Sequence, residues 1–440
     1  MLYPFRQRMA RLSFVPALLL MSTLWSSGAD VPQAGETLGF ARCIEIALAQ
    51  HPDLQAYRFS ATAAAAQVEQ AKSGYYPAVD ITTGLRRDHA VATYVHDKPI
   101  LPGNAVKDGD DISATIGFRQ TLYDFGKTRA SVDITKQRFF SAQFDYDTIA
   151  DDAVFRVKTA YYGVLRAAKA RDVLAESVTT YEQHLQQAKA FYEAGTKPRY
   201  DVTKAELDLS NEQLNLIKAE NSLKLGWVSL NKAMGLESSS EYVLNDNLVF
   251  AAYPMILEEA IQAALKDRPD LKSLQAKLSG AEEIIKLDKT EYYPLLSADG
   301  NYRFDGSDFP LDNGWTARLT MSINIFNGFA TKQRVQEAMA NASAAKARIE
   351  SLRLDIHGEI EKDYLFLGEA QQSIANAEIQ VRLATENLEL ANRRYEAGVG
   401  NPVEVADAIT SMNDASLAQI NALYEYKVAQ AAIEKAMARR

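Results

Sequence analysis

The sequence predicts a mixed α and β membrane protein in which long helices and short strands alternate in two tandem copies of one unit. Three observations support this prediction. Landmark segments recur at fixed offsets, apolar and polar residues alternate in four short segments, and two long stretches contain no proline and favour helix. Strict alternation is typical of strands, and an apolar residue every seven positions is typical of packed helices.

The first 29 residues have the order of a secretory signal peptide. Basic residues precede the apolar run LSFVPALLLMSTLW, and the small-residue stretch SSGA follows it up to Ala29. The run covers 14 residues, whereas a transmembrane helix needs about 20, so we expect cleavage and export rather than an N-terminal membrane anchor. No later apolar run approaches spanning length, which argues against an α-helical membrane protein but not against a β-barrel.

The tandem duplication is visible in four pairs of landmarks. Two pairs lie 217 residues apart: ALAQHPDL (47–54) with ALKDRPDL (264–271), and YYP (75–77) with YYP (292–294). Two more lie 203 residues apart: LYDFGKT (122–128) with IFNGFAT (325–331), and YEAG (192–195) with YEAG (395–398). One insertion in the first copy explains the change of offset. We therefore expect a signal peptide over 1–29, a first repeat over 30–235, a linker over 236–255 and a second repeat over 256–440.

Each repeat contains two segments with strand-like alternation. They cover about 78–88 and 112–123 in the first copy, and about 295–304 and 315–326 in the second. In the first segment, Val79, Ile81 and Leu85 lie on one face, and Asp80 and Arg86 on the other. Strands of about ten residues cross a bilayer when tilted. Because the polar face carries repeated charge, like a watered lumen, we favour a membrane barrel; a soluble antiparallel sheet is the alternative.

Long helices follow the strands. Residues 126–193 and 329–397 contain no proline, and each would extend for roughly 100 Å as a helix. The second stretch has seven-residue spacing at Ile360, Leu367, Ile374, Val381, Leu388 and Tyr395. Pro77 and Pro294 end the two YYP motifs and mark helix-to-strand transitions, because proline disfavours helix in the residue before it.

Shorter helices complete the predicted rod. After the turn at 195–201, helix 201–235 covers half of the first long helix, and helix 256–290 covers the rest. Segments 38–74 and 402–438 are expected to pair in the same way with the second long helix, whose turn spans 398–404. The arrangement closes if all four strands lie at one end and both turns at the other. We therefore predict a periplasmic tube that continues an outer-membrane barrel.

Several classes of function find no support in the composition. The net charge of −9 gives no footprint for nucleic-acid binding. Cys43 is the single cysteine, so no disulfide framework exists. The five histidines lack metal-ligand spacing, and we expect His184 and His357 on helix surfaces. Since no phosphate loop or nucleophile motif is present either, we expect no enzyme, no metal and no cofactor.

The arrangement resembles the TolC-like outer membrane efflux proteins over about residues 36–437. The motifs that carry the resemblance are QTLYDFGKTRA, INIFNGFATKQ, FYEAGTKPRYDVTKAEL and RYEAGVGNPVEVADAITS. The resemblance implies a homotrimer in the outer membrane, in which four strands per chain close a twelve-stranded barrel and leave no sheet edge. Helical tracks would form a coiled-coil barrel in the periplasm. The implied partners are a periplasmic adaptor, an inner-membrane pump of the RND or ABC type and outer-membrane lipid.

The resemblance also implies a site at the two turns, which in the family contact the adaptor and narrow the channel. The adaptor-contact residues carried over are Gly195, Thr196, Asp201, Gly398 and Val399, and the candidate periplasmic gate is Asp201, Tyr395, Glu404 and Asp407. Both glycines fit a position that needs positive φ. Carboxylates repeated three times around an axis would favour cations. Alternatively, Glu404 and Asp407 simply favour a helix N-terminus.

One position departs from the family pattern. Gly400 stands where some relatives have an arginine that pairs with carboxylates, while the first tip has a basic residue at Lys197 or Arg199. The predicted function is a passive exit duct for small-molecule efflux. The alternative with the same fold is the outer-membrane component of a type I protein secretion system. A periplasmic coiled-coil scaffold without a pore is a third hypothesis, and it predicts a protein that needs no detergent.

Overall fold

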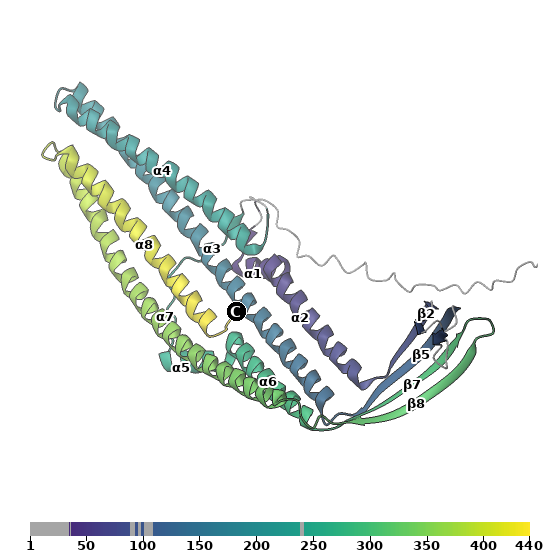
Figure 1. The fold of residues 1–440 in the computed structure, drawn as a ribbon. Coiled ribbons are helices and arrows are strands. Elements are labelled where there is room, and N and C mark those ends of the chain that lie inside the picture. The colour runs from purple at the N-terminus through teal and green to yellow at the C-terminus, as the bar shows by residue number, and fades with distance from the viewer. Residues whose placement is uncertain (1–34, 36, 89–92, 96–97, 101–108, 238–241) are drawn as a thin grey trace, which may run out of the picture.

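A computed structural model describes residues 35, 37–88, 93–95, 98–100, 109–237 and 242–440. The expected signal peptide over 1–29 lies outside the described residues. The chain forms a long bent rod of helices that ends in a curved sheet (Figure 1). The helices are α1 (Phe40–Gln50), α2 (Pro52–Lys72), α3 (Lys127–Glu193), α4 (Arg199–Met234), α5 (Leu257–Asp267), α6 (Pro269–Lys289), α7 (Ala330–Glu396) and α8 (Pro402–Ala436).

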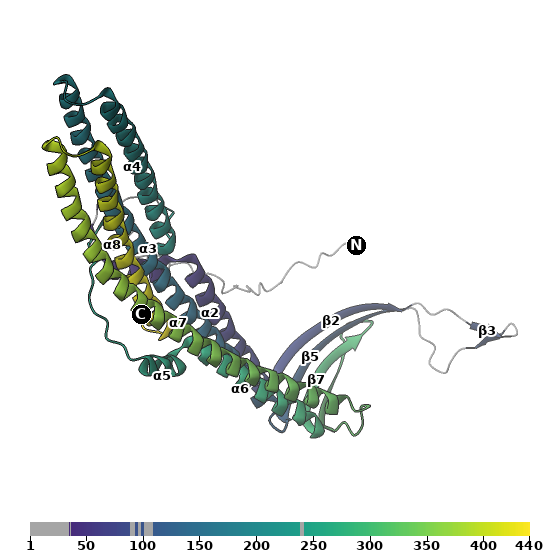
Figure 2. The ribbon, with the colours of Figure 1, turned by 90° about the vertical axis from the view of Figure 1, so that its left-hand side faces the viewer.

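Four antiparallel strands form the curved sheet in the order β2-β5-β7-β8. They are β2 (Ala78–Asp88), β5 (Gly109–Tyr123), β7 (Leu295–Gly306) and β8 (Asp312–Ser322). Two small pairs are separate from it, namely β1 (Thr37–Leu38) with β6 (Val243–Leu244) and β3 (Thr93–Val95) with β4 (Lys98–Ile100). Figure 2 shows β3 beyond the tip of the main sheet. The last strand, β8, begins three residues and ends four residues before the predicted 315–326.

The strand register gathers the apolar side chains on one face of the sheet. Ile81 lies opposite Ile116, which lies opposite Tyr302, which lies opposite Trp315. Ile81 and Trp315 are 71% and 73% exposed in the single chain. On the other face, Arg119 lies opposite Asp299, which lies opposite Arg318. One face is therefore apolar and open, as the alternation predicts, and the other carries opposite charges in register.

The two long helices, α3 and α7, have 67 residues each. The apolar stripe predicted from the seven-residue spacing is confirmed for four of its six residues: Ile360 and Tyr395 are fully buried and Leu367 and Ile374 nearly so, whereas Val381 and Leu388 are half-buried in the single chain. Equal length and equal position in the two repeats follow from the duplication. Among the described helices, none combines the length and the apolar character that a bilayer crossing requires.

The shorter helices differ from the prediction in two respects. The segments expected as continuous helices over 38–74 and 256–290 are broken before Pro52 and Pro269, because the preceding His51 and Arg268 adopt ψ angles of 123° and 125°. Gly235 at the end of α4 packs against the first break, where an added Cβ would lie 2.7 Å from the His51 Cα. The repeated ALAQHPDL and ALKDRPDL landmarks therefore mark helix breaks.

The second difference concerns neighbours. The segment 38–74 was expected to pair with the second long helix, but α1 and α2 pack against α3. In the half of the rod near the sheet, α6 lies between α3 and α7. In the far half, α4 and α8 both pack against α3, and α8 also packs against α7. Helix α2 and helix α7 are therefore the outer helices of the chain near the sheet (Figure 1).

Candidate functional site

The turn between α3 and α4 is closed by two hydrogen bonds to the Phe191 carbonyl oxygen. Gly195 has a φ of +70°, which glycine adopts without steric cost. The backbone N–H of Thr196 donates to the Phe191 oxygen at 3.0 Å, and the Thr196 hydroxyl donates to the same oxygen at 2.9 Å. Pro198 has extended backbone angles and precedes the first residue of α4. The turn is therefore short and fully specified by local bonds.

The turn between α7 and α8 has a similar pattern of backbone hydrogen bonds, and its backbone packs more closely at Gly400. Gly398 has a φ of +74°, and the N–H groups of Val399 and Gly400 both donate to the Arg394 oxygen, at 3.1 and 2.8 Å. The Asn401 side chain accepts from the Val403 N–H at 2.8 Å and caps α8. A Cβ on Gly400 would lie 2.7 Å from the Tyr395 nitrogen. An arginine at position 400 is therefore incompatible with this turn.

A lysine of the first turn contacts the second turn. The Lys197 ammonium donates to the Gly400 carbonyl oxygen at 3.2 Å and lies 5.4 Å from the centre of the Tyr395 ring. Both turns lie at the end of the rod opposite the sheet (Figure 1). Of the two basic residues left open by the sequence, Lys197 makes this contact. Within the second turn itself, Arg394 pairs with Glu404 at 3.3 Å between Nε and Oε2.

Ionisable side chains are buried beneath the turns. Tyr395 is fully buried, and its ring centre lies 5.1 Å from that of His184 and 5.6 Å from that of Phe191. His184 and Asp201 are 5% and 4% exposed. Within the described part of the chain, the Tyr395 hydroxyl and the His184 Nδ1 have no hydrogen-bond partner. The expectation that His184 is a surface residue was therefore wrong.

Burial shifts the pKa values of His184 and Tyr395. Burial lowers the pKa of His184, an effect opposed by the nearby carboxylates of Asp208 and Asp201. Burial also raises the pKa of the Tyr395 hydroxyl, and the Asp201 charge adds to this. The ring of His184 is therefore favoured in its neutral form. A signal for its burial exists in the sequence, because Ser177, Tyr181, His184 and Ala188 follow a 4-3-4 spacing and all four are buried.

A polar seam continues from this cluster along α3, α4 and α8. The Tyr181 hydroxyl lies 3.2 Å from the Thr410 hydroxyl. The Asn413 amide donates to Ser177 Oγ at 2.5 Å and to Glu212 Oε1 at 2.9 Å. Polar contacts of this kind can be exchanged for bonds to water when two helices separate.

The predicted gate residues fall into two environments. Asp201 and Tyr395 lie together in the interior of the chain, whereas Glu404 and Asp407 are exposed on α8. The predicted contact residues Gly195, Thr196, Gly398 and Val399 are exposed, and Val399 is 70% exposed. At the other end of the rod, Pro77 and Pro294 follow Tyr76 and Tyr293, whose backbones are extended, and the strands β2 and β7 start directly after them. The described residues contain no group of three or more His, Cys, Asp or Glu side chains placed to hold a metal.

Comparisons with known proteins agree on one family. The family model described as outer membrane efflux protein matches residues 43–236 and 260–439. The outer membrane protein TolC of Vibrio cholerae is 22% identical over 387 residues, which is 85% of each protein. Protein CyaE of Bordetella pertussis is 24% identical over 382 residues, covering 85% of this chain and 78% of CyaE.

The fold is also shared with solved channel structures. The Campylobacter jejuni CmeC outer membrane channel aligns with a TM-score of 0.77 at 18% identity, covering 91% of this chain and 85% of CmeC.

Proposed function

The chain belongs to the outer membrane efflux protein family, and we propose that it forms the outer-membrane exit duct of a tripartite export system for small molecules. In this proposal the sheet lies in the outer membrane and the rod extends into the periplasm. The protein acts as a passive conduit and not as an enzyme. An adaptor and an inner-membrane pump would supply the cargo and the energy.

The observation that carries the proposal is that a single chain leaves complementary edges open. Strands β2 and β8 are each paired on one side within the four-stranded sheet. A membrane does not tolerate such edges, and three copies that join β8 to the β2 of the next chain would form a closed barrel of twelve strands. One contact repeated around a threefold axis closes a ring.

Two helices of the rod, α4 and α7, expose apolar side chains in the single chain. Helix α4 exposes Leu207, Leu214 and Ile217 at 57%, 50% and 61%. Helix α7 exposes Leu354 and Leu365 at 75% and 66%. Apolar side chains in rows on two different helices are typical of an interface between subunits. The same trimer would cover them and place α7 of one chain beside α2 and α4 of the next.

The inner wall of the proposed duct is assigned from the two faces of α3. Val157 and Tyr161 pack into the apolar cluster beneath α1. Arg156, Gly163 and Arg166 lie on the other face and line a groove of about 1690 Å³ between α4 and α8. Helix α1 and the cluster beneath it would block a lumen if they lay on the inner side of α3. We therefore assign the α1 side of α3 to the outside of the duct and the groove to the inside. The groove also contains Asp208, Glu212 and Asp414, so cargo would pass along a polar wall.

At the far end, the two turns would contact the adaptor, and the gate would lie between them. The buried pair of Asp201 and Tyr395 is then part of the support of the gate, and the exposed Glu404 and Asp407 are the groups able to reach the lumen. This division follows from their burial in the chain. It leaves cation selectivity to the two residues of α8.

Planar-bilayer conductance of the detergent-purified protein tests the proposal. We expect a trimer that inserts spontaneously and gives discrete conductance steps. One variant tests the assigned interface: Leu365→Glu, on the open side of α7, should reduce the trimer fraction. A monodisperse monomer without detergent would support the scaffold hypothesis and contradict the duct.

A further inference from the structure

We propose that the ends of α2, α3, α6 and α7 next to the sheet form a basic collar that binds the anionic phosphate headgroups of phospholipids at the periplasmic surface of the outer membrane. The proposal rests on the proposed function, because the sheet must lie in that membrane. The basic collar is defined as four segments of eight residues: 69–76, 124–131, 286–293 and 327–334. The duplication makes the first equivalent to the third and the second equivalent to the fourth.

The charge of the collar is opposite to that of the chain. The four segments contain seven basic and four acidic residues and so carry a net charge of +3, which becomes +1 when Asp133 and Glu283, the ion-pair partners of Arg129 and Lys286, are included. The whole chain carries −9. A trimer would have this excess three times around a ring. A local positive band on an acidic protein is the pattern that attracts an anionic surface.

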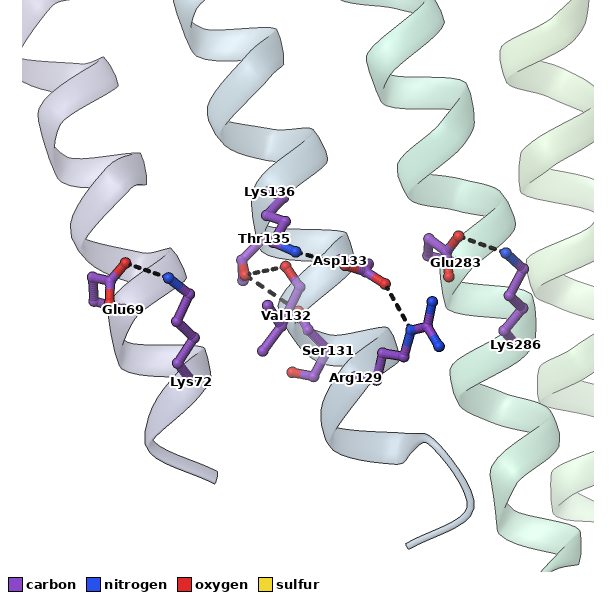
Figure 3. A network of polar contacts seen from close by, with 10 residues as sticks. All are labelled: Glu69, Lys72, Arg129, Ser131, Val132, Asp133, Thr135, Lys136, Glu283 and Lys286. Atoms are coloured by element: carbon purple, nitrogen blue, oxygen red, sulfur yellow. Dashed lines mark hydrogen bonds and ion pairs between the residues drawn. The ribbon is translucent and has the colours of Figure 1, made fainter. Parts of the chain in front are cut away.

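Both repeats provide basic residues at matching helix ends. Lys72 and Lys289 are 217 residues apart, near the ends of α2 and α6, and Arg129 and Lys332 are 203 residues apart, near the starts of α3 and α7. The Arg129 side chain is 83% exposed. Figure 3 shows Lys72 and Arg129 at about one level on neighbouring helices, with Lys286 of α6 beside them.

The helix dipole does not account for all four positions. Lysines at the C-terminal ends of α2 and α6 are favoured by the dipole, but basic residues at the N-terminal ends of α3 and α7 are disfavoured. Neither α3 nor α7 has an acidic residue in its first turn, although Asp124, just before α3, accepts hydrogen bonds from the Gly126 and Thr128 N–H groups. A ligand of negative charge outside the chain would explain why Arg129 and Lys332 are basic.

Nearby carboxylates pair with two of these four cations. Lys72 pairs with Glu69 at 2.7 Å, and Asp133 is shared between Arg129 at 3.7 Å and Lys136 at 3.1 Å (Figure 3). Exposed pairs of this kind contribute little free energy and exchange readily. Phosphate oxygens at the same surface can therefore compete for the same donors.

Aromatic residues place the collar at the level of the headgroups. An aromatic girdle directly adjoins the sheet: Tyr75, Tyr76, Tyr123, Phe125, Tyr292, Tyr293, Phe326 and Phe329, exposed by 41–72%. Tyrosine is enriched at the boundary between hydrocarbon and water. Lys72 and Lys289 lie one helical turn from Tyr76 and Tyr293, so their ammonium groups reach the phosphate layer when the rings lie in the boundary.

The test measures lipid selectivity of the reconstituted trimer. Wild-type protein is placed in phosphatidylcholine vesicles, and the association of spin-labelled phosphatidylglycerol is compared with that of spin-labelled phosphatidylcholine by electron paramagnetic resonance. One basic residue near an anionic surface contributes about 1 kcal/mol, so we expect up to about fivefold preference for phosphatidylglycerol, reduced towards unity in high salt. The variant Lys72→Gln/Arg129→Gln/Lys289→Gln/Lys332→Gln should lose most of it.

The control carries four equal changes elsewhere on the rod: Lys224→Gln/Lys266→Gln/Lys346→Gln/Arg382→Gln. It should retain the wild-type preference. Equal preference in both variants, or no salt-dependent preference in the wild type, would overturn the proposal. Bilayer conductance of the same wild-type sample distinguishes failure of the basic collar from failure of the proposed duct. A conducting trimer without lipid preference would contradict the collar and leave the duct proposal intact. The wild-type salt series decides the matter even where the fourfold variant does not assemble.

Discussion

Replacing Lys197 with methionine should loosen the contact between the two helical turns. The substitution keeps most of the aliphatic stem and removes the ammonium group, which donates to the Gly400 oxygen at 3.2 Å and lies 5.4 Å from the Tyr395 ring centre. Because Lys197 is half-buried, we assign about 1 kcal/mol to the hydrogen bond and about 0.5 kcal/mol to the ring contact. The sum, roughly 1.5 kcal/mol, corresponds to about a tenfold shift in the opening equilibrium.

Hydrogen exchange followed by mass spectrometry measures this equilibrium in the detergent-solubilised protein. The informative amides are those of Thr196 and Gly400, which donate within the turns. Their exchange should accelerate about tenfold in Lys197→Met. Amides in the apolar core around Ile360 should keep their wild-type rates, because that residue is fully buried far from the turns.

Lys189→Met is the matched control. Its ammonium lies 3.3 Å from Glu206 between α3 and α4, and both side chains are about half exposed. A pair of this kind contributes little, so exchange at the turns should not change. If the two variants exchange alike, or if Lys197→Met is indistinguishable from wild type, the inter-turn contact has no energetic role and the reasoning fails.

Four further predictions concern the same end of the rod. Gly400→Ala should cost roughly 1–3 kcal/mol through overlap with the Tyr395 backbone, seen as faster exchange at the second turn. Gly398→Val places a β-branched residue at φ +74° at a cost of roughly 1–2 kcal/mol, and should impair export in cells while trimers still form in the membrane fraction. Burial lowers the pKa of His184, so the folded chain disfavours the protonated imidazole. The free energy of unfolding should therefore stay constant above the ordinary pKa near 6.5 and decrease as the pH falls below it. Hydrogen exchange should accordingly accelerate in acid in wild type but not in His184→Gln. Neutralising Glu404 and Asp407 together should reduce cation selectivity in single-channel recordings, and unchanged selectivity would assign both to capping of α8.

Periodicity predicted the parts of the fold that depend on local pattern. Most of the seven-residue stripe of α7 is buried, and the alternation of β2 and β5 gives one apolar face, because each side chain's direction follows from its position in the element. The residues before Pro52 and Pro269 were available as break signals, but the surrounding helical pattern outweighed them. The surface position predicted for His184 was wrong because the residue is polar. Its spacing from Tyr181 and Ala188, which are both buried, places it on the buried face of α3.

The sequence did not determine which helices pack against one another. A stripe specifies that a helix face is covered, but it does not distinguish a helix of the same chain from one of another copy. The segment 38–74 was paired with the second long helix, whereas α2 packs against α3 and leaves the outer side of α7 open. Within the proposed trimer, α2 of the next chain would cover that side.

The strength of the contacts between α3 and α8 changes along the rod, and this determines where the proposed duct should open. Near the middle, Lys158 pairs with Glu434 at 2.6 Å, with side chains 8% and 20% exposed, and Lys435 pairs with Asp152 at 2.7 Å. Separating the helices there would break both ion pairs, of which the Lys158–Glu434 pair is largely buried. Towards the turns, the polar contacts between the same two helices are those of Tyr181, Thr410 and Asn413, whose hydrogen bonds contribute about 1 kcal/mol each and can be replaced by water. Separation of the helices should therefore begin at the turns and stop at the charged middle, which leaves the sheet and the membrane seal undisturbed while the periplasmic end widens.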